Sequence, residues 1–219
     1  MTMQSSPEFI NRSINDAPIR GYLHRSVSGA DGLILTHGAG ANCQSLLLTS
    51  LATDFCAAGL TVLRCDLPFR RLRPHGPPPP GSAPRDQNGL GAAVEFMRST
   101  VTGRVFLGGH SYGGRQASML AADCPGLVER LLLLSYPLHP PKRPMELRTK
   151  HFSLLQTPAM FVHGTCDGFG SIAEVTDALK LIPASTELLQ VSGAGHELMT
   201  TRNRGELSEE LVEKFLSVL

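Results

Sequence analysis

Three side chains that could together form a nucleophilic site lie far apart in the sequence. Ser111 stands between glycines in the stretch GHSYGG, Asp167 lies in HGTCDGFG, and His196 lies in SGAGHEL. A serine hydroxyl is a weak nucleophile at neutral pH and needs an imidazole to accept its proton, and the imidazole needs a carboxylate to hold its tautomer. The residue types therefore suggest acyl transfer, with Ser111 as nucleophile, His196 as general base and Asp167 as the orienting acid.

The elements that must position these residues alternate between short apolar runs and helical patterns. Six runs are strand candidates: 32–38, 61–65, 104–109, 128–135, 159–164 and 186–193. Five stretches are helix candidates: 46–58, 89–98, 115–122, 172–181 and 206–219. Repetition of strand then helix predicts an α/β protein, with a mostly parallel sheet of six or more strands and helices on both faces.

Two further segments complete the predicted organisation of a single domain over residues 1–219. In residues 1–30, Asn15 and Asp16 separate two strand-like pieces, which predicts antiparallel strands at an edge of the sheet. Residues 67–86 are rich in proline and are expected to form an extended loop on the surface. This loop is too short to separate two domains.

The possible site residues follow predicted strands, where ligands bind in an open parallel sheet. The first strand ends in HGAGA, residues 37–41, whose backbone N–H groups could face an anion; later strands end at Ser111, Asp167 and His196. Other acids are weaker candidates. Asp66 is expected to be a turn residue, and His163 is expected to be packed rather than catalytic.

Composition excludes several other classes of protein. The chain has 219 residues and a net charge of +1, so it is not a globally basic nucleic-acid binder. No apolar run approaches the length of about 18 residues that suggests a membrane span, and the first residues do not resemble a signal peptide. Five cysteines without a CxxC pair indicate neither a disulfide framework nor a zinc site. We therefore expect a cytoplasmic protein.

These motifs carry a resemblance to a known family. The strand–GHSYGG–helix pattern, with HGAGA before it and HGTCDGFG and GAGH after it, resembles the α/β-hydrolase superfamily and its dienelactone-hydrolase-like branch. Within that branch, the stretches RCDLPFRRLRPHGPPPP and YPLHPPKRPMELRTKHF resemble a group of bacterial hydrolases related to a testis-expressed protein and to a subunit of the NSL histone acetyltransferase complex.

The resemblance implies an α/β-hydrolase fold without a cap domain and a serine hydrolase of the carboxylesterase type. It implies a nucleophile elbow at Ser111 and an oxyanion hole formed by the backbone N–H groups of Tyr112 and of Ala39 or Gly40. It implies neither a cofactor nor a metal. The sequence departs from the group beside the acid, where Cys166 and Gly168 replace a basic residue and a proline.

Basic residues concentrate in two segments, 64–85 and 142–150, that follow strands. We expect their charge to gather near the site and to favour a small anionic substrate, with Arg71 and Arg143 as candidate binding residues. The alternative is that these loops are charged only to remain solvated. No nucleic-acid partner is expected, because Phe69 is the sole aromatic residue of the two segments.

The same sequence features allow three other interpretations. HGAGANC followed by Asp66 could begin a dinucleotide site, but Cys43 replaces the third glycine. A metal site made by Asp167, His163 and His196 has no helical HxxxH spacing to favour it. The main alternative is a binding or scaffold protein that keeps the fold without the chemistry.

Overall fold

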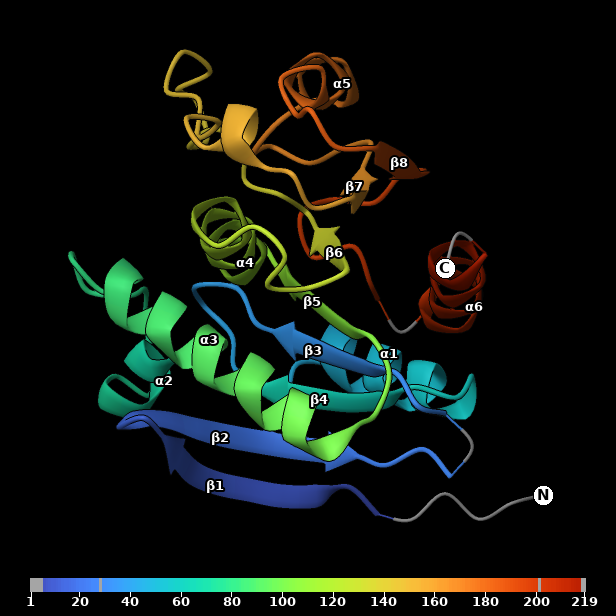
Figure 1. Cartoon of the computed structure of the whole chain (residues 1–219). Coiled ribbons are helices and arrows are strands. Elements are labelled where there is room, and N and C mark those ends of the chain that lie inside the picture. The colour runs from blue at the N-terminus through green and yellow to red at the C-terminus, as the bar shows by residue number, and fades with distance from the viewer. Residues whose placement is uncertain (1–5, 28, 201, 218–219) are drawn as a thin grey trace.

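One sheet runs through the part of the chain that the computed structural model describes, residues 6–27, 29–200 and 202–217. Among these residues it has eight strands in the order β1-β2-β4-β3-β5-β6-β7-β8, seen from bottom to top in Figure 1. The strands are β1 Glu8–Ile14, β2 Ala17–His24, β3 Gly32–Thr36, β4 Thr61–Cys65, β5 Val105–His110, β6 Arg130–Leu134, β7 Ala159–Gly164 and β8 Thr186–Val191.

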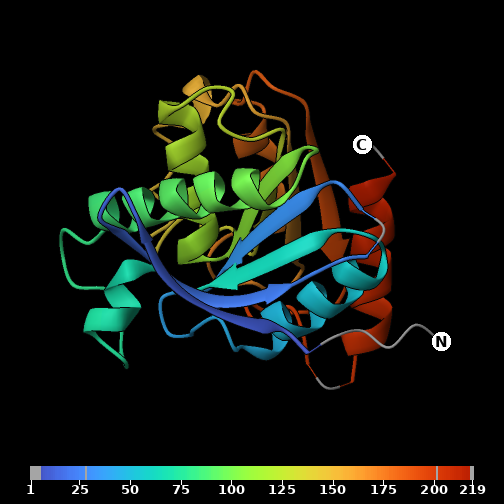
Figure 2. The same ribbon diagram turned by 60° about the horizontal axis from the view of Figure 1, so that its bottom comes forward.

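Helices cover both faces of this sheet, as the sequence pattern predicts. They are α1 Leu46–Ala57, α2 Pro68–Leu72, α3 Ala83–Thr100, α4 Tyr112–Asp123, α5 Ile172–Leu179 and α6 Arg204–Leu216, with a 3-10 turn, η1, at Phe152–Leu154. Side chains of α1 and α6 share one buried cluster, in which Phe55 meets Phe215 edge to face. Side chains of α3, α4 and α5 share the cluster on the other face. Figure 2 shows α1 and α6 next to each other, with α3 across the sheet from them.

The inner strands are buried along their whole length because both of their faces are covered. Every residue of β3, β4, β5, β6 and β7 is buried. In β1, which has a neighbour on one side only, Ile10 is the one buried residue. Continuous burial in the middle and polar residues at the edge are typical of a parallel sheet between helical layers.

The strand pairing brings the predicted site residues to one edge. β3 pairs in parallel with β4 and β5, and the parallel series continues through β6, β7 and β8. Thr36 lies opposite both Cys65 and Gly109, and Gly164 lies opposite Val191. The loops that follow β3, β5, β7 and β8 therefore start at the same edge of the sheet.

The N-terminal hairpin has the predicted form. β1 and β2 are antiparallel, and Asn15 and Asp16 form the turn between them with positive φ angles of 48° and 62°. β2 also pairs with β4 in antiparallel fashion, which attaches the hairpin to the sheet. Residues 1–5 and 28 of the predicted edge region lie outside the described residues, as do residues 218–219 of the last predicted helix.

The prediction of a continuous loop over residues 67–86 is wrong at both ends. Helix α2 occupies Pro68–Leu72, and α3 begins at Ala83 instead of residue 89. Pro68 and Pro84 stand in the first turns of these helices. Proline is tolerated there because the first N–H groups of a helix have no partner within the helix. Between the two helices the chain is irregular, as predicted.

In the described parts of the chain, no helix combines the length and the apolar character needed to cross a membrane.

Candidate active site

Ser111 occupies the sharp turn between β5 and α4. Its φ is 51° and its ψ is −114°, a conformation that L-residues rarely adopt. The turn is held from both sides: the Ser111 N–H donates to the Leu134 carbonyl at 2.8 Å, and its own carbonyl accepts the first helical hydrogen bond from Arg115 at 2.9 Å. The strained turn presents the hydroxyl at the carboxyl edge of the sheet, with Ser111 only 8% exposed.

The turn is possible only because glycines flank it. A Cβ atom on Gly109 would lie 2.8 Å from Thr36 Cγ2, and one on Gly113 would lie 2.6 Å from the His37 carbonyl oxygen. Real Cβ atoms do not approach other atoms so closely. The glycines therefore let β5, α4 and the loop after β3 pack directly around Ser111.

Asp167 lies in the turn that follows β7, and its carboxylate is fully buried. Oδ1 accepts a hydrogen bond from the Phe169 N–H, and Oδ2 faces His196 Nδ1, both at 2.8 Å. Burial alone would raise the pKa of Asp167, but the hydrogen bonds from His196 and Phe169 outweigh it and leave the pKa below its ordinary value. The carboxylate is therefore ionised at neutral pH.

His196 connects the acid to the serine. Its Nδ1 lies 2.8 Å from Asp167 Oδ2, and its Nε2 lies 2.8 Å from Ser111 Oγ. An ionised carboxylate can only accept a hydrogen bond, so Nδ1 carries the proton and donates to Asp167. In the neutral ring Nε2 is then the acceptor, and the Ser111 hydroxyl donates to it. The structure thus brings together the three residues that the sequence suggested.

Two aromatic rings that the sequence analysis did not single out hold His196. The ring of Phe169 stacks on it with centroids 4.0 Å apart. On the nucleophile side, buried His110 donates from Nε2 to the carbonyl oxygen of His196 at 2.8 Å. Burial lowers the pKa of His110, so this ring stays neutral. The sequence offered one indication of these roles: His110 directly precedes Ser111, and Phe169 follows Asp167 by two residues.

The loop after β3 packs beside Ser111 with its carbonyl groups turned inward. The Gly38 carbonyl accepts from His37 Nδ1 at 2.8 Å and from the Ala41 N–H at 3.1 Å, and the Ala39 carbonyl accepts from Arg70 Nη2 at 2.6 Å. Burial lowers the pKa of His37 to about 4, which keeps its ring neutral. In a trans peptide, the carbonyl group and the N–H of the following residue point in opposite directions. The N–H groups of Ala39 and Gly40 therefore point away from the side chains that donate to the Gly38 and Ala39 carbonyls.

A pocket of about 630 Å³ lies over Ser111 and His196. The loop after β3, the first turn of α4 and Phe169 line it. Pro77 and Pro78 of the proline-rich loop also line it. The proline-rich loop therefore forms part of the wall of the site.

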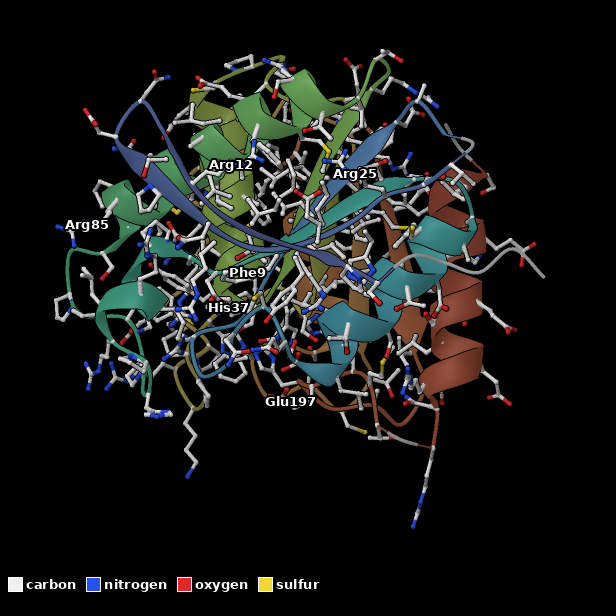
Figure 3. All side chains as sticks on the ribbon, turned by 90° about the horizontal axis from the view of Figure 1, so that it is seen from below. Phe9, Arg12, Arg25, His37, Arg85 and Glu197 are labelled. Carbon is white, nitrogen blue, oxygen red and sulfur yellow. The ribbon has the colours of Figure 1, made fainter. Side chains whose placement is uncertain are left out.

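The basic residues named from the sequence lie elsewhere. Arg71 lines a separate cavity of about 1070 Å³ between the β1–β2 hairpin and helices α2 and α3, and exposed Arg143 pairs with Glu146. Arg85 lines that same separate cavity, and Figure 3 shows it at the left, far from Glu197 at the lower edge, which lines the Ser111 pocket. Neither Arg71 nor Arg143 lines the Ser111 pocket, so their role in binding a substrate stays a prediction.

Two arginines do line the Ser111 pocket, Arg115 and Arg148. Arg148 belongs to the predicted basic segment 142–150, but Arg115 was missed. Arg115 follows Ser111 by four residues, and on a helix that starts at Ser111 this spacing places both residues on the same side. This spacing could have identified Arg115 from the sequence.

The remaining polar candidates have structural partners. His163 donates from Nε2 to the Gly170 carbonyl at 2.8 Å, and Asp66 accepts from the Cys43 N–H at 2.8 Å. Both fit the packed and turn-forming roles expected of them. Within the described residues, no three His, Cys, Asp or Glu side chains are grouped so that they could hold a metal ion.

Solved structures of hydrolases have the same fold. The chain is similar to dienelactone hydrolase from Anabaena variabilis (TM-score 0.79, 20% identity, 98% of this chain and 99% of that chain covered). It is also similar to Est1E from Butyrivibrio proteoclasticus (TM-score 0.76, 16% identity, coverage 97% and 98%). A third is an alpha-beta serine hydrolase homologue from Coxiella burnetii (TM-score 0.75, 19% identity, coverage 98% and 99%).

At these identities the likeness concerns the fold, and that fold is the α/β-hydrolase fold, an eight-stranded, mostly parallel sheet between helical layers in the described residues. The sequence itself provides the second line of evidence. Residues 29–219 match the family described as Alpha/beta hydrolase domain, which covers all of the chain beyond the N-terminal hairpin. On both grounds the chain belongs to the alpha/beta hydrolase domain family.

Proposed function

We propose that this protein is a serine hydrolase that cleaves an ester-type bond of a small substrate through an acyl-enzyme on Ser111. The observation that carries the proposal is the unbroken chain of two 2.8 Å hydrogen bonds from Asp167 through His196 to Ser111. A hydroxyl held in this way in the wall of a pocket, on a strained turn, is arranged for nucleophilic attack.

Acylation follows from this geometry. The Ser111 oxygen attacks the carbonyl carbon of the ester while its proton passes to His196 Nε2, and ionised Asp167 stabilises the ring that becomes positively charged. The carbonyl oxygen becomes an oxyanion, which the N–H of Tyr112 at the start of α4 and the N–H of Ala39 or Gly40 would bind. Loss of one such donor costs about 3–4 kcal/mol of transition-state stabilisation.

The tetrahedral intermediate then collapses. The bond from carbon to the leaving oxygen breaks, and His196 Nε2 returns the proton to the departing alcohol. A water molecule enters by the reverse path: it gives a proton to Nε2, attacks the acyl carbon and releases the acid, while the Ser111 oxygen regains its proton. This route uses backbone donors and side chains only, so neither a cofactor nor a metal takes part in it.

The test is covalent labelling with a fluorophosphonate, followed by rates on p-nitrophenyl esters of increasing chain length. The native protein should gain one label on the peptide containing Ser111, and it should hydrolyse short esters. Ser111→Ala should do neither. Ser99→Ala, which removes an exposed serine of α3, is the matched control and should behave like the native protein.

Absence of both labelling and hydrolysis in the folded native protein would refute the proposal. The binding or scaffold role would then be the better interpretation. The narrower resemblance, to the group that includes the testis-expressed protein and the NSL complex subunit, stays a prediction in either case.

A further inference from the structure

We propose that Arg115 and Arg148 form a subsite for an oxyanion group of the substrate, so that the preferred substrate is an ester whose short acyl chain ends in a carboxylate or a similar anion. This inference rests on the proposed hydrolase function and adds a substrate class to it. It also replaces Arg71 and Arg143 as the residues that would bind the anion.

Both arginines are built into the wall of the pocket that contains Ser111. Arg115 lies one turn into α4, and its N–H is bonded to the Ser111 carbonyl at 2.9 Å, so its side chain and the nucleophile start from the same side of one helix. The side chain is half-buried and its Nε atom, which has no solvent contact, has no hydrogen-bond partner. A donor buried without a partner is uncommon and needs a reason.

The backbone of Arg148 is fixed independently of α4. Its N–H donates to the Leu138 carbonyl at 2.8 Å, and its carbonyl accepts from the Tyr136 hydroxyl at 2.6 Å. The Arg148 Nη1 makes a long contact, 3.4 Å, with the Pro137 carbonyl, which leaves most of the guanidinium donors available. The loop thus holds a second cation in place over the site.

Within the part of the chain that the structure describes, neither of the two charges forms an ion pair with a carboxylate, although the charge of Glu146 acts to raise the pKa of Arg148. Among the described residues, neither arginine has a carboxylate within 4.0 Å, Glu197 of the same pocket included. Burial, and then the charge of Arg115, lower the pKa of Arg148. Two half-buried cations that repel each other are stabilised by an anion between them, and the planar guanidinium suits a carboxylate or phosphate.

The rest of the lining describes the remainder of the substrate. Pro77, Pro78, Pro137 and Phe169 present apolar surface in the same pocket as the arginines and the reacting serine. A short methylene chain would lie against such surface, with the ester carbonyl at Ser111 and the anion at the guanidinium groups. The pocket volume of about 630 Å³ admits a small molecule of this kind.

The experiment compares two esters, p-nitrophenyl hydrogen adipate and p-nitrophenyl methyl adipate, which differ in the charge at the far end of the acyl chain and in one methyl group. The measured quantity is the ratio of their kcat/KM values, after subtraction of the spontaneous rates. The native protein should prefer the charged ester by at least about tenfold, and this preference should weaken with added salt. Arg115→Gln and Arg148→Gln should each lower the ratio by about tenfold.

Two controls make the result specific. Arg143→Gln, which removes an exposed arginine outside the pocket, should keep the native ratio. Inorganic phosphate should compete with the charged ester in the native protein and compete less in Arg115→Gln. If phosphate instead accelerates the neutral ester, the subsite binds a free anion rather than the substrate, and the proposed substrate class is wrong.

Fluorophosphonate labelling separates the two proposals. If the native protein and both glutamine variants label on Ser111 but the native protein hydrolyses both esters equally, the oxyanion subsite is refuted and the hydrolase stands. If the folded native protein does not label at all, the hydrolase itself fails. A variant that loses both labelling and its thermal transition is misfolded and does not test the subsite. Arg115→Lys then takes its place: it retains a cation, so it should retain part of the preference for the charged ester.

Discussion

The ring of Phe169 stacks on the ring of His196, with centroids 4.0 Å apart and planes inclined by 27°. The backbone N–H of the same phenylalanine donates to Asp167 Oδ1 at 2.8 Å. One residue therefore holds both the imidazole and the carboxylate that orients it. Because the first contact belongs to the side chain and the second to the backbone, substitution of the side chain can separate them.

Phe169→Leu should lower kcat for a short-chain ester by about 10-fold to 100-fold, since a ring misplaced by a fraction of an ångström accepts the Ser111 proton poorly. The Asp167 contact remains, because leucine supplies the same N–H. Phe9→Leu, at an exposed position on β1, is the control and should keep native kinetics. A change in KM with native kcat would show that Phe169 contacts substrate without positioning His196.

Asp167→Asn should reduce kcat by about 10⁴-fold with the fold intact. The Phe169 N–H requires an acceptor, so the amide oxygen takes the place of Oδ1 and the amide NH₂ faces His196 Nδ1. That arrangement forces the ring proton onto Nε2, where it can no longer accept from Ser111. Single-turnover labelling by a fluorophosphonate should slow in parallel.

Asp177→Asn is the matched control for this change, because Asp177 is an exposed carboxylate of α5 that pairs with exposed Lys180. Surface pairs of this kind contribute little, so both rate and stability should stay native. A rate for Asp167→Asn within tenfold of the native rate would remove Asp167 from the proposed mechanism.

Much of the fold could be predicted from hydrophobic patterning alone. Buried runs such as 131–134 and 159–162 are apolar on both faces, as is typical of strands covered by helices on both sides. The start of α3 could not be predicted in this way. A proline in the interior of a helix ends it, whereas a proline in the first turn is favoured. The sequence pattern alone does not show that Pro84 stands in the first turn of α3.

The site shows the same division. Ser111, Asp167 and His196 follow predicted strands, so their meeting at one edge follows from the parallel order of the sheet. The direction of a side chain on a short helix or loop depends on packing instead. Arg71 follows a strand that ends at the edge of the sheet that carries the site, yet α2 places it beside the β1–β2 hairpin. Arg115 lies in a predicted helix, and the helical pattern does not show that its side chain lines the pocket.

EDTA should leave ester hydrolysis unchanged. Every group used in the proposed mechanism is a side chain or a backbone N–H, so no step depends on a metal ion. The measurement is the initial rate after prolonged incubation with the chelator and dialysis, with a zinc-dependent esterase treated in parallel to prove that removal was complete. Loss of activity that zinc restores would contradict the mechanism.

Gly113→Ala should destabilise the protein by about 1–3 kcal/mol and slow labelling of Ser111. The new Cβ atom would meet the His37 carbonyl oxygen at 2.6 Å, which forces α4 away from the loop after β3. Gly91→Ala makes the same chemical change at a position of α3 where the new Cβ atom would meet no atom within 4 Å outside its own stretch of helix. It should instead stabilise the protein by about 0.5–1 kcal/mol. Urea denaturation measures both, and equal shifts in the two variants would contradict the packing argument.

The protein should lose stability as the pH falls from about 6.5 to about 4. Burial lowers the pKa of His24, His37 and His151 from 6.5 to about 4 in the folded protein. Within this window the unfolded chain binds protons that the folded protein does not, so the free energy of unfolding decreases as the pH is lowered. Below about pH 4 both states are protonated and these three groups contribute no further loss.

The urea midpoint, measured at intervals from pH 7 to pH 4, should therefore decline, and His24→Gln should flatten the decline. Glutamine retains an acceptor for the Arg64 Nε–H, which His24 Nε2 accepts at 3.0 Å, but it does not titrate. His75→Gln changes an exposed ring of the proline-rich loop and should leave the slope as it is in the native protein. Equal slopes for His24→Gln and the native protein would show that the buried His24 ring does not set the acid limit of this fold.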